Sequence, residues 1–242
     1  MWKMWFCIVI LLLIAGVFAE VERELHTFCI TRYKVLSPKW NGEKSGKIIF
    51  LSDLHNHEYG LHNKKLIDKI KKENPELILI GGDILVGKED ISYESAAEFV
   101  EAICKIAPVY YANGNHEQRM KEKPEKYGNA FVGYKKRLLD AGVHFLENES
   151  AEVELGGNKL CLTGLELQLE VYEKMKTHKV TKEDVAQKVG PAKQEEVQIL
   201  LAHNPEYMEA YQAWGADITL SGHLHGGLIC LPNGKSVITP QF

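Results

Sequence analysis

Five short apolar segments, each followed at once by residues that can ligate a metal, constrain the fold of this chain most. In chain order they are residues 47–52 before Asp53 and His55, 77–82 before Asp83, 108–114 before Asn115 and His116, 197–202 before His203, and 218–222 before His223 and His225. Sites in open α/β sheets form outside the carboxyl ends of strands. Each pairing alone is common by chance, but five at equivalent places predict that these side chains share one crevice.

The stretches between these segments predict an α/β fold. Helical patterns at 61–74, 95–106 and 134–141 alternate with the apolar runs, which is typical of βαβ units and a largely parallel sheet. The second half is richer in strands, which we expect at 151–155, 159–163, 197–202, 218–221 and 228–231. Between them, residues 165–193 form a polar stretch that we interpret as a helical insertion. Two packed sheets flanked by helices fit this order best.

The N-terminus carries an uncharged apolar run at residues 4–19, preceded by Lys3 and followed by Glu20, Glu22 and Glu24. We therefore expect residues 1–19 to be a membrane anchor or a signal segment, and residues 20–242 to be the working domain. The order of charges places the N-terminus in the cytoplasm and the domain outside. A single-pass anchor in the cell membrane is the preferred interpretation, and a secreted protein with a cleaved signal is the alternative.

Composition narrows the classes of partner. A formal net charge of −4 weighs against a stable nucleic-acid partner, which usually meets a basic surface. The five cysteines are widely spaced without a C-x-x-C pair, so we expect neither a disulfide framework nor a thiolate metal site. A length of 242 residues favours one catalytic domain, and we expect a monomer.

The residue types at the strand ends suit two-metal chemistry at phosphorus. Two divalent ions held ~3.5–4 Å apart can clamp the attacking and leaving oxygens of an in-line displacement. One carboxylate must bridge ions that lie so close, and a single aspartate among the other ligands suits that role. Imidazoles and an amide oxygen complete the shells without adding charge that repels phosphate. Oxygen and nitrogen ligands suit two divalent metal ions, with manganese favoured and iron, zinc or magnesium as alternatives.

At these residues the chain resembles calcineurin-like metallophosphoesterases. The resemblance rests on Asp53-x-His55, Gly82-Asp83, Gly114-Asn115-His116-Glu117, His203 and Gly222-His223-x-His225, and it spans residues 47–227. The N-terminal anchor, LSDLH and SGHLHGG are similar to the membrane-associated bacterial phosphoesterase branch. The family resemblance implies a four-layer α/β/β/α sandwich of two mixed sheets flanked by helices. Because the chain ends at Phe242, soon after His225, the second sheet could be incomplete.

The resemblance also implies roles for individual residues. One metal would be bound by Asp53, His55, Asp83 and His225, and the other by Asp83, Asn115, His203 and His223. Asp83 would bridge them, and a bridging hydroxide would attack phosphorus. His116, together with Asn115 and Asp83, would form the catalytic group, with His116 donating to the leaving oxygen or stabilising its charge. We expect the His116 imidazole to titrate near neutrality, and Glu117 either orients it or serves as a carboxylate at a helix N-terminus.

Departures from the family narrow the activity. Val86 and Gly87 stand where protein Ser/Thr phosphatases carry Asp and Arg, and Val86 stands where purple acid phosphatases carry Tyr. Neither subfamily is therefore supported. From the family resemblance and the N-terminal segment, the expected function is hydrolysis of a phosphodiester or phosphomonoester outside the cytoplasm, with a lipid, nucleotide or envelope polymer as substrate. A DNA nuclease on the same core and a non-catalytic metal-binding relative are the alternatives.

Overall fold

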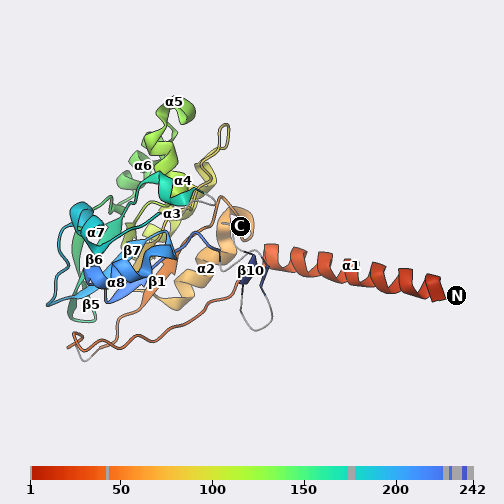
Figure 1. The fold of residues 1–242 in the computed structure, drawn as a ribbon, viewed down its shortest axis with the longest axis horizontal. Helices are drawn as coiled ribbons and strands as arrows, with labels where there is room; N and C mark the ends of the chain where they lie inside the picture. The colour runs from red at the N-terminus through yellow and green to blue at the C-terminus, as the bar shows by residue number, and fades with distance from the viewer. Residues whose placement is uncertain (1, 42–43, 174–177, 226–228, 231–235, 239–242) are drawn as a thin grey trace.

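The structure is a computed structural model that describes residues 2–41, 44–173, 178–225, 229–230 and 236–238. Helix α1 (Trp2–His26) projects away from the rest of the molecule, and none of its residues is buried (Figure 1). By length and composition this helix could span a membrane, and a signal sequence can have the same length and composition. The helix continues past the predicted segment 1–19, whose boundary with the working domain stays a prediction.

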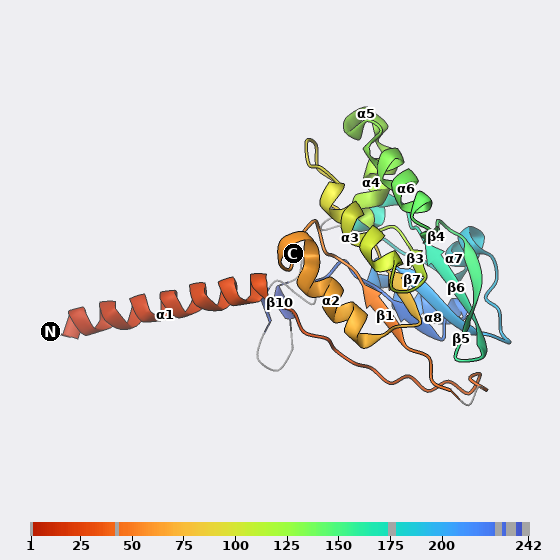
Figure 2. The ribbon, with the colours of Figure 1, turned by 180° about the vertical axis from the view of Figure 1, so that it is seen from behind.

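The first sheet contains strands β1 (Ile48–Leu51), β2 (Leu77–Ile80), β3 (Val109–Tyr111) and β4 (His144–Phe145), in that spatial order. All its strand pairs are parallel. The connections run through a 3₁₀ turn (Leu61–Asn63), α2 (Lys64–Glu73), α3 (Glu94–Cys104), α4 (Asn115–Glu122), α5 (Pro124–Tyr127) and α6 (Ala130–Asp140). Figure 2 shows α2 and α3 in front of this sheet. Within the described residues the first sheet is thus parallel, in line with its βαβ pattern, whereas the family resemblance implies two mixed sheets.

The second sheet contains strands β5 (Ser150–Leu155), β6 (Asn158–Leu165), β7 (Val197–Ala202) and β8 (Ile218–Leu220), in that order. Strands β5 and β6 pair antiparallel and the others parallel, so this sheet is mixed. Helices α7 (Lys182–Val189) and α8 (Met208–Trp214) cover its outer face (Figure 1). Strands β9 (Ile229–Cys230) and β10 (Ser236–Ile238) form a separate antiparallel pair. The predicted strand 228–231 is described only at residues 229–230.

Alternation along the buried strands builds the layers. In β2, Ile78 and Ile80 pack with the helices on the outer face, whereas Leu77 and Leu79 pack against the second sheet. Successive side chains of a strand point to opposite faces, so a strand that is apolar throughout must be covered on both sides. Strand β7 follows the same rule, with Ile199 facing inward and Leu200 facing α7 and α8. These contacts confirm the four-layer α/β/β/α sandwich.

The segment predicted as a helical insertion, residues 165–193, differs from that interpretation. In its described part it is helical only at a 3₁₀ turn (Leu169–Tyr172) and at α7. Val171 and Val185 are buried in the cluster that covers the second sheet. The segment is therefore part of the outer layer, because its few apolar residues fall where they meet α8. Residues 174–177 lie outside the described part.

Candidate metal centre

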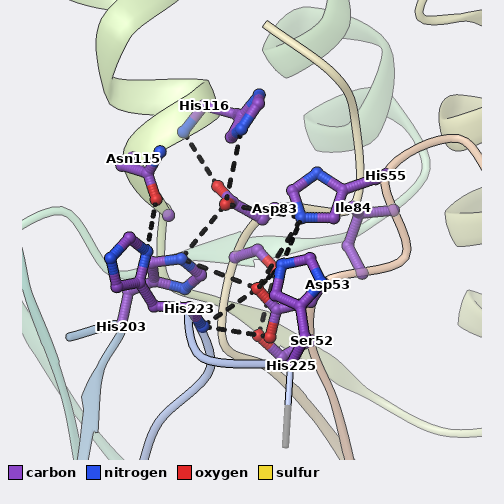
Figure 3. Close-up of polar contacts among 12 residues, drawn as sticks. Ser52, Asp53, His55, Asp83, Ile84, Asn115, His116, His203, His223 and His225 are labelled. Atoms are coloured by element: carbon purple, nitrogen blue, oxygen red, sulfur yellow. Dashed lines mark hydrogen bonds and ion pairs between the residues drawn. The ribbon is translucent and has the colours of Figure 1, made fainter. Parts of the chain in front are cut away.

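The sandwich brings the seven predicted ligands and His116 to one place, at the carboxyl ends of four strands and the start of α4 (Figure 3). The turns after β1, β2 and β8 carry aspartates and histidines whose φ angles are positive: Asp53 (57°), His55 (48°), Asp83 (54°), His223 (68°) and His225 (53°). Left-handed backbone is uncommon for residues other than glycine, although Asp, Asn and His are enriched there. Such conformations persist where the surrounding structure enforces them, and they cluster at functional sites.

Asp83 lies at the centre of the group. Its Oδ2 is 3.1 Å from Nε2 of His203, 3.8 Å from Nε2 of His55 and 3.9 Å from Nε2 of His116. Its side chain is only 2% exposed. Burial raises the carboxyl pKa, but the charge of His203 and its hydrogen bond outweigh burial and hold the pKa of Asp83 below its ordinary value. Asp83 is therefore an anionic group surrounded by imidazoles.

His203 is oriented by a backbone carbonyl. Its Nδ1 is 2.7 Å from the oxygen of Gly81. A carbonyl can only accept, so Nδ1 donates and the second nitrogen, Nε2, faces Asp83. Burial lowers the imidazole pKa, but the charge of Asp83 and its hydrogen bond outweigh it and raise the pKa of His203 to about 9. This pairing of one ring nitrogen with a carbonyl is common for metal-ligating histidines.

Asp53 joins the turn after β1 to the turn after β8. Its carboxylate accepts the backbone N–H of His223 at 2.9 and 3.1 Å, and Oδ1 lies 3.6 Å from Nε2 of His225. The Nε2 atoms of His55 and His225 are 3.0 Å apart. Burial is the largest influence on His55 and lowers its pKa, which favours the neutral imidazole that a metal requires.

Asn115 places its side-chain amide next to His203, His223 and Asp83. Its Oδ1 is 3.1 Å from Nδ1 of His223. With the amide turned over, its nitrogen would be 3.1 Å from Nδ1 of His223, 3.2 Å from Nε2 of His203 and 3.1 Å from Oδ2 of Asp83. The nitrogen orientation satisfies Asp83 and Nδ1 of His223 without a cation, whereas the oxygen orientation places Oδ1 against these two acceptors and favours a cation. The donor set therefore fits a divalent metal.

Within the part of the chain that the structure describes, three groups of side chains have ligand atoms within 4.8 Å of one another. They are Asp53, His55 and His225; His55, Asp83 and His116; and Asp53, Asp83 and His203. The groups share Asp53, His55 and Asp83, so the ligand atoms form one continuous cluster rather than separate sites. His223 joins this cluster through Asn115, and its Nε2 is buried without a hydrogen-bond partner.

His116 lies in the cluster but is held differently from the others. The backbone N–H of Gly87 donates to its Nδ1 at 2.8 Å, so the neutral ring carries its proton on Nε2, which faces Asp83. Burial lowers the pKa of His116 to about 4, so the expectation of an imidazole titrating near neutrality is not supported. Gly87 comes this close because it has no side chain: a Cβ there would lie 2.7 Å from the His116 carbonyl oxygen.

For Glu117 the structure supports the second of the two alternatives, a carboxylate at a helix N-terminus, and Tyr172 is a contributor that the sequence analysis missed. The Glu117 carboxylate does not orient the His116 ring; it accepts backbone N–H groups, including that of Gly114 at the start of α4. Tyr172 packs edge-on to His223 with ring centroids 5.0 Å apart. Tyr172 belongs to the segment that the sequence analysis interprets as a polar insertion. The apolar Val171 beside it was the one local sign that this part of the segment packs against the domain. A cavity of about 490 Å³ opens beside Asp53 and His225, and it is lined by these two residues and by Phe50, Ser52, Ser221 and Gly222.

The four-layer fold and this donor set define a metal-dependent hydrolase. Residues 46–227 match the family described as calcineurin-like phosphoesterase. The match covers most of the chain, so the chain belongs to the calcineurin-like phosphoesterase family and is a phosphoester hydrolase by class. The resemblance found in the motifs is thereby confirmed.

Relatives support the same family. The uncharacterized protein YpbG of Bacillus subtilis is 25% identical over 209 residues, which cover 84% of this chain and 68% of that protein. Phosphodiesterase YaeI of Escherichia coli is 26% identical over 77% of this chain and 63% of its own length. The uncharacterized metallophosphoesterase YkoQ of Bacillus subtilis is 27% identical over 78% of this chain and 64% of its own length. The last two are matched over less than two thirds of their length.

A solved structure supports the fold. The crystal structure of phosphopantetheinyl hydrolase (PptH) from Mycobacterium tuberculosis aligns with a TM-score of 0.50 over 74% of this chain and 83% of that chain. The sequence identity is 13%, so the likeness concerns the fold alone.

Proposed function

We propose that this chain hydrolyses phosphoesters with a centre of two divalent metal ions bridged by Asp83. The observation that carries the proposal is the place of this buried carboxylate, with His203 on one side and His55 on the other, 3.1 and 3.8 Å from the same oxygen. Membership of the family supports metal-dependent phosphoesterase chemistry. The number of ions and the bridging role are proposals.

The ligands divide into two sets. An outer set of Asp53, His55 and His225 and an inner set of Asn115, His203 and His223 would each hold one ion, with Asp83 common to both. The ions, when bound, would supply positive charge to the phosphoryl oxygens and acidify a water molecule. Manganese suits the mixture of carboxylate, imidazole and amide, and iron, zinc and magnesium are alternatives.

His116 serves the chemistry rather than metal binding. A metal ligand needs a free lone pair, but Gly87 occupies Nδ1 and the proton occupies Nε2. The Nε2–H group of His116 therefore lies beside Asp83, with Nε2 3.9 Å from Oδ2. We propose that this N–H donates a hydrogen bond to the oxygen on which charge develops as the phosphoester bond breaks. Removing one such donor typically costs about 10²–10³ in kcat.

The substrate and location extend this proposal. One relative is named a phosphodiesterase, which favours a diester, and a monoester is the alternative. Helix α1 favours a protein anchored in the cell membrane, with its domain outside and a lipid, nucleotide or envelope polymer as substrate; secretion is the alternative. We propose a monomer without a stable nucleic-acid partner, in line with the net charge of −4.

Turnover of bis-p-nitrophenyl phosphate and p-nitrophenyl phosphate, measured across Mn²⁺, Zn²⁺, Fe²⁺ and Mg²⁺, tests the proposal. We expect metal-dependent hydrolysis that favours the diester and is abolished by a chelator. Cleavage of linear DNA at a comparable rate would favour the nuclease alternative. Metal binding without turnover of either ester would favour the non-catalytic alternative.

A further inference from the structure

Glu117 is a fully buried carboxylate beside the metal centre, and among the described residues its hydrogen bonds go to backbone amides and a tyrosine hydroxyl. Its residue is 0% exposed, and its two oxygens are shared among four donors. Oε2 accepts the backbone N–H groups of Asp83 at 2.8 Å and Gly114 at 3.0 Å. Oε1 accepts the backbone N–H of Ile84 at 3.1 Å and the hydroxyl of Tyr111 at 2.7 Å.

These donors come from different parts of the sheet. Asp83 and Ile84 form the turn after β2, Tyr111 ends β3, and Gly114 precedes the first residue of α4. The first turn of a helix leaves backbone N–H groups without intrahelical partners, and a glutamate at the third helical position often satisfies one of them. Here the same carboxylate also satisfies two N–H groups of the neighbouring ligand turn. One side chain therefore joins the backbone of the central aspartate to the backbone that begins the Asn115 helix.

The two turns are in direct contact. A Cβ at Gly114 would lie 2.2 Å from Oδ1 and 2.7 Å from the backbone nitrogen of Asp83, so only glycine fits there. The backbone N–H of His116 also donates to Oδ1 of Asp83 at 2.8 Å. Asp83 is thus held from both ends, because its backbone donates to Glu117 and its carboxylate accepts from His116.

A chain of hydroxyls completes the arrangement. Tyr111 and Tyr134 are both fully buried, and their hydroxyl oxygens are 3.1 Å apart. Tyr111 gives its proton to Glu117, so Tyr134 donates to Tyr111. The carboxylate is therefore linked to α6 as well as to β2, β3 and α4. A carboxylate has about four acceptor positions, so the site leaves none for water.

From this geometry we propose that Glu117 is a positioning residue that sets the bridging geometry of Asp83 relative to Asn115. The inference rests on the proposed function, because it assigns Glu117 to the same centre. Glutamine at this position has one oxygen and one NH₂ group. Either orientation would turn the NH₂ group toward two existing donors, so the turn after β2 would shift. Partners behind metal ligands typically contribute about 10–100-fold to metal affinity.

The test is a calorimetric titration of the full chain, in detergent, with Mn²⁺. Thermal unfolding is measured separately on the metal-free protein. We expect Glu117→Gln to weaken Mn²⁺ binding by about 10–100-fold while the metal-free variant still unfolds cooperatively. Tyr111→Phe removes one of the four donors and should weaken binding by less. The matched control is Glu125→Gln, the same chemical change at an exposed position, which should leave binding unchanged.

The outcomes separate this inference from the proposed function. Wild-type protein that binds no second equivalent of Mn²⁺ would contradict the two-metal proposal whatever the variants do. Unchanged Mn²⁺ affinity in Glu117→Gln with a lower melting temperature would overturn the positioning role and leave Glu117 a structural residue. Should that variant not fold, Tyr111→Phe decides, since unchanged affinity there also overturns the inference.

Discussion

The inner and outer ligands of the centre differ in burial and in how they are held. The side chain of the inner ligand His203 is 0% exposed and that of the shared Asp83 is 2% exposed, whereas those of His55 and His225 in the outer set are 20% and 35% exposed. Nδ1 of His203 donates to a backbone carbonyl. In contrast, the ring nitrogens of His55 and His225 meet each other.

The difference follows from where the chain delivers these side chains. Asp83, His203 and Asn115 leave β2, β7 and the start of α4, between two packed sheets, and of the inner ligands only His223 follows β8. The outer ligands leave β1 and β8, which are edge strands of their sheets. Buried ligands with fixed orientation lose little freedom on binding, so we expect the inner ion to bind tightly and the outer ion to exchange.

The largest expected effect is that of Asp83→Ala, because Asp83 is the only ligand that the inner and outer sets share. Loss of several kcal/mol of charge stabilisation corresponds to about 10³-fold or more in kcat/KM. We expect the variant to lose both ions together. Elemental analysis and diester turnover measure this, with exposed Asp68→Ala as the control. An Asp83→Ala protein that keeps one tightly bound ion would show that the two positions are independent.

His116→Asn should lower kcat by about 10²–10³ and leave the metal content unchanged. The shorter side chain can still accept the N–H of Gly87, but it loses the N–H at Nε2. The loss should be greater for an alkyl ester than for a nitrophenyl ester, since nitrophenolate needs little stabilisation. Equal losses on both esters, or loss of metal, would mean that His116 only supports Asn115.

Single substitutions in the inner and outer ligand sets should distinguish the two ions by their rates of release. Dialysis of the metal-loaded wild type against a chelator should release one equivalent quickly and the other slowly. His225→Ala should lack the fast phase and His203→Ala the slow phase. Release of both equivalents in one phase from the wild type would remove the distinction between inner and outer positions.

The smallest expected effect is the release of a proton. The pKa of His203 is raised to about 9 in the metal-free protein, above its ordinary value of 6.5. The ring is therefore protonated at pH 7.5, and metal binding must displace that proton. The His203–Asp83 pair stabilises the metal-free fold fully below pH 6.5 and ceases to do so as pH rises through about 9. Calorimetry in buffers of different ionisation enthalpy should show about one proton released near pH 7.5 and none above pH 10.

The sequence predicts the layers and the ligands because both depend on local pattern. Apolar runs such as 77–80 and 197–202 identify strands, and the rule that sites form at strand ends places Asp83 and His203 together. The architecture followed from alternation of strands and helices.

The groups that orient the ligands could not be predicted in this way. The carbonyl of Gly81 and the amide of Gly87 are backbone groups that exist at every residue, and only the folded turns aim them at His203 and His116. The pKa of His116 depends on burial, which local pattern does not give. Tyr172 was missed because its segment is rich in Lys and Glu, although its ring packs against His223.

Titration of metal-free wild-type protein with Mn²⁺, with diester hydrolysis followed at each addition, tests the two-metal proposal most directly. We expect binding to saturate at two equivalents, with little activity while the inner position fills and full activity as the outer position fills. Saturation at one equivalent, or full activity before the second equivalent is bound, would contradict a two-metal centre bridged by Asp83.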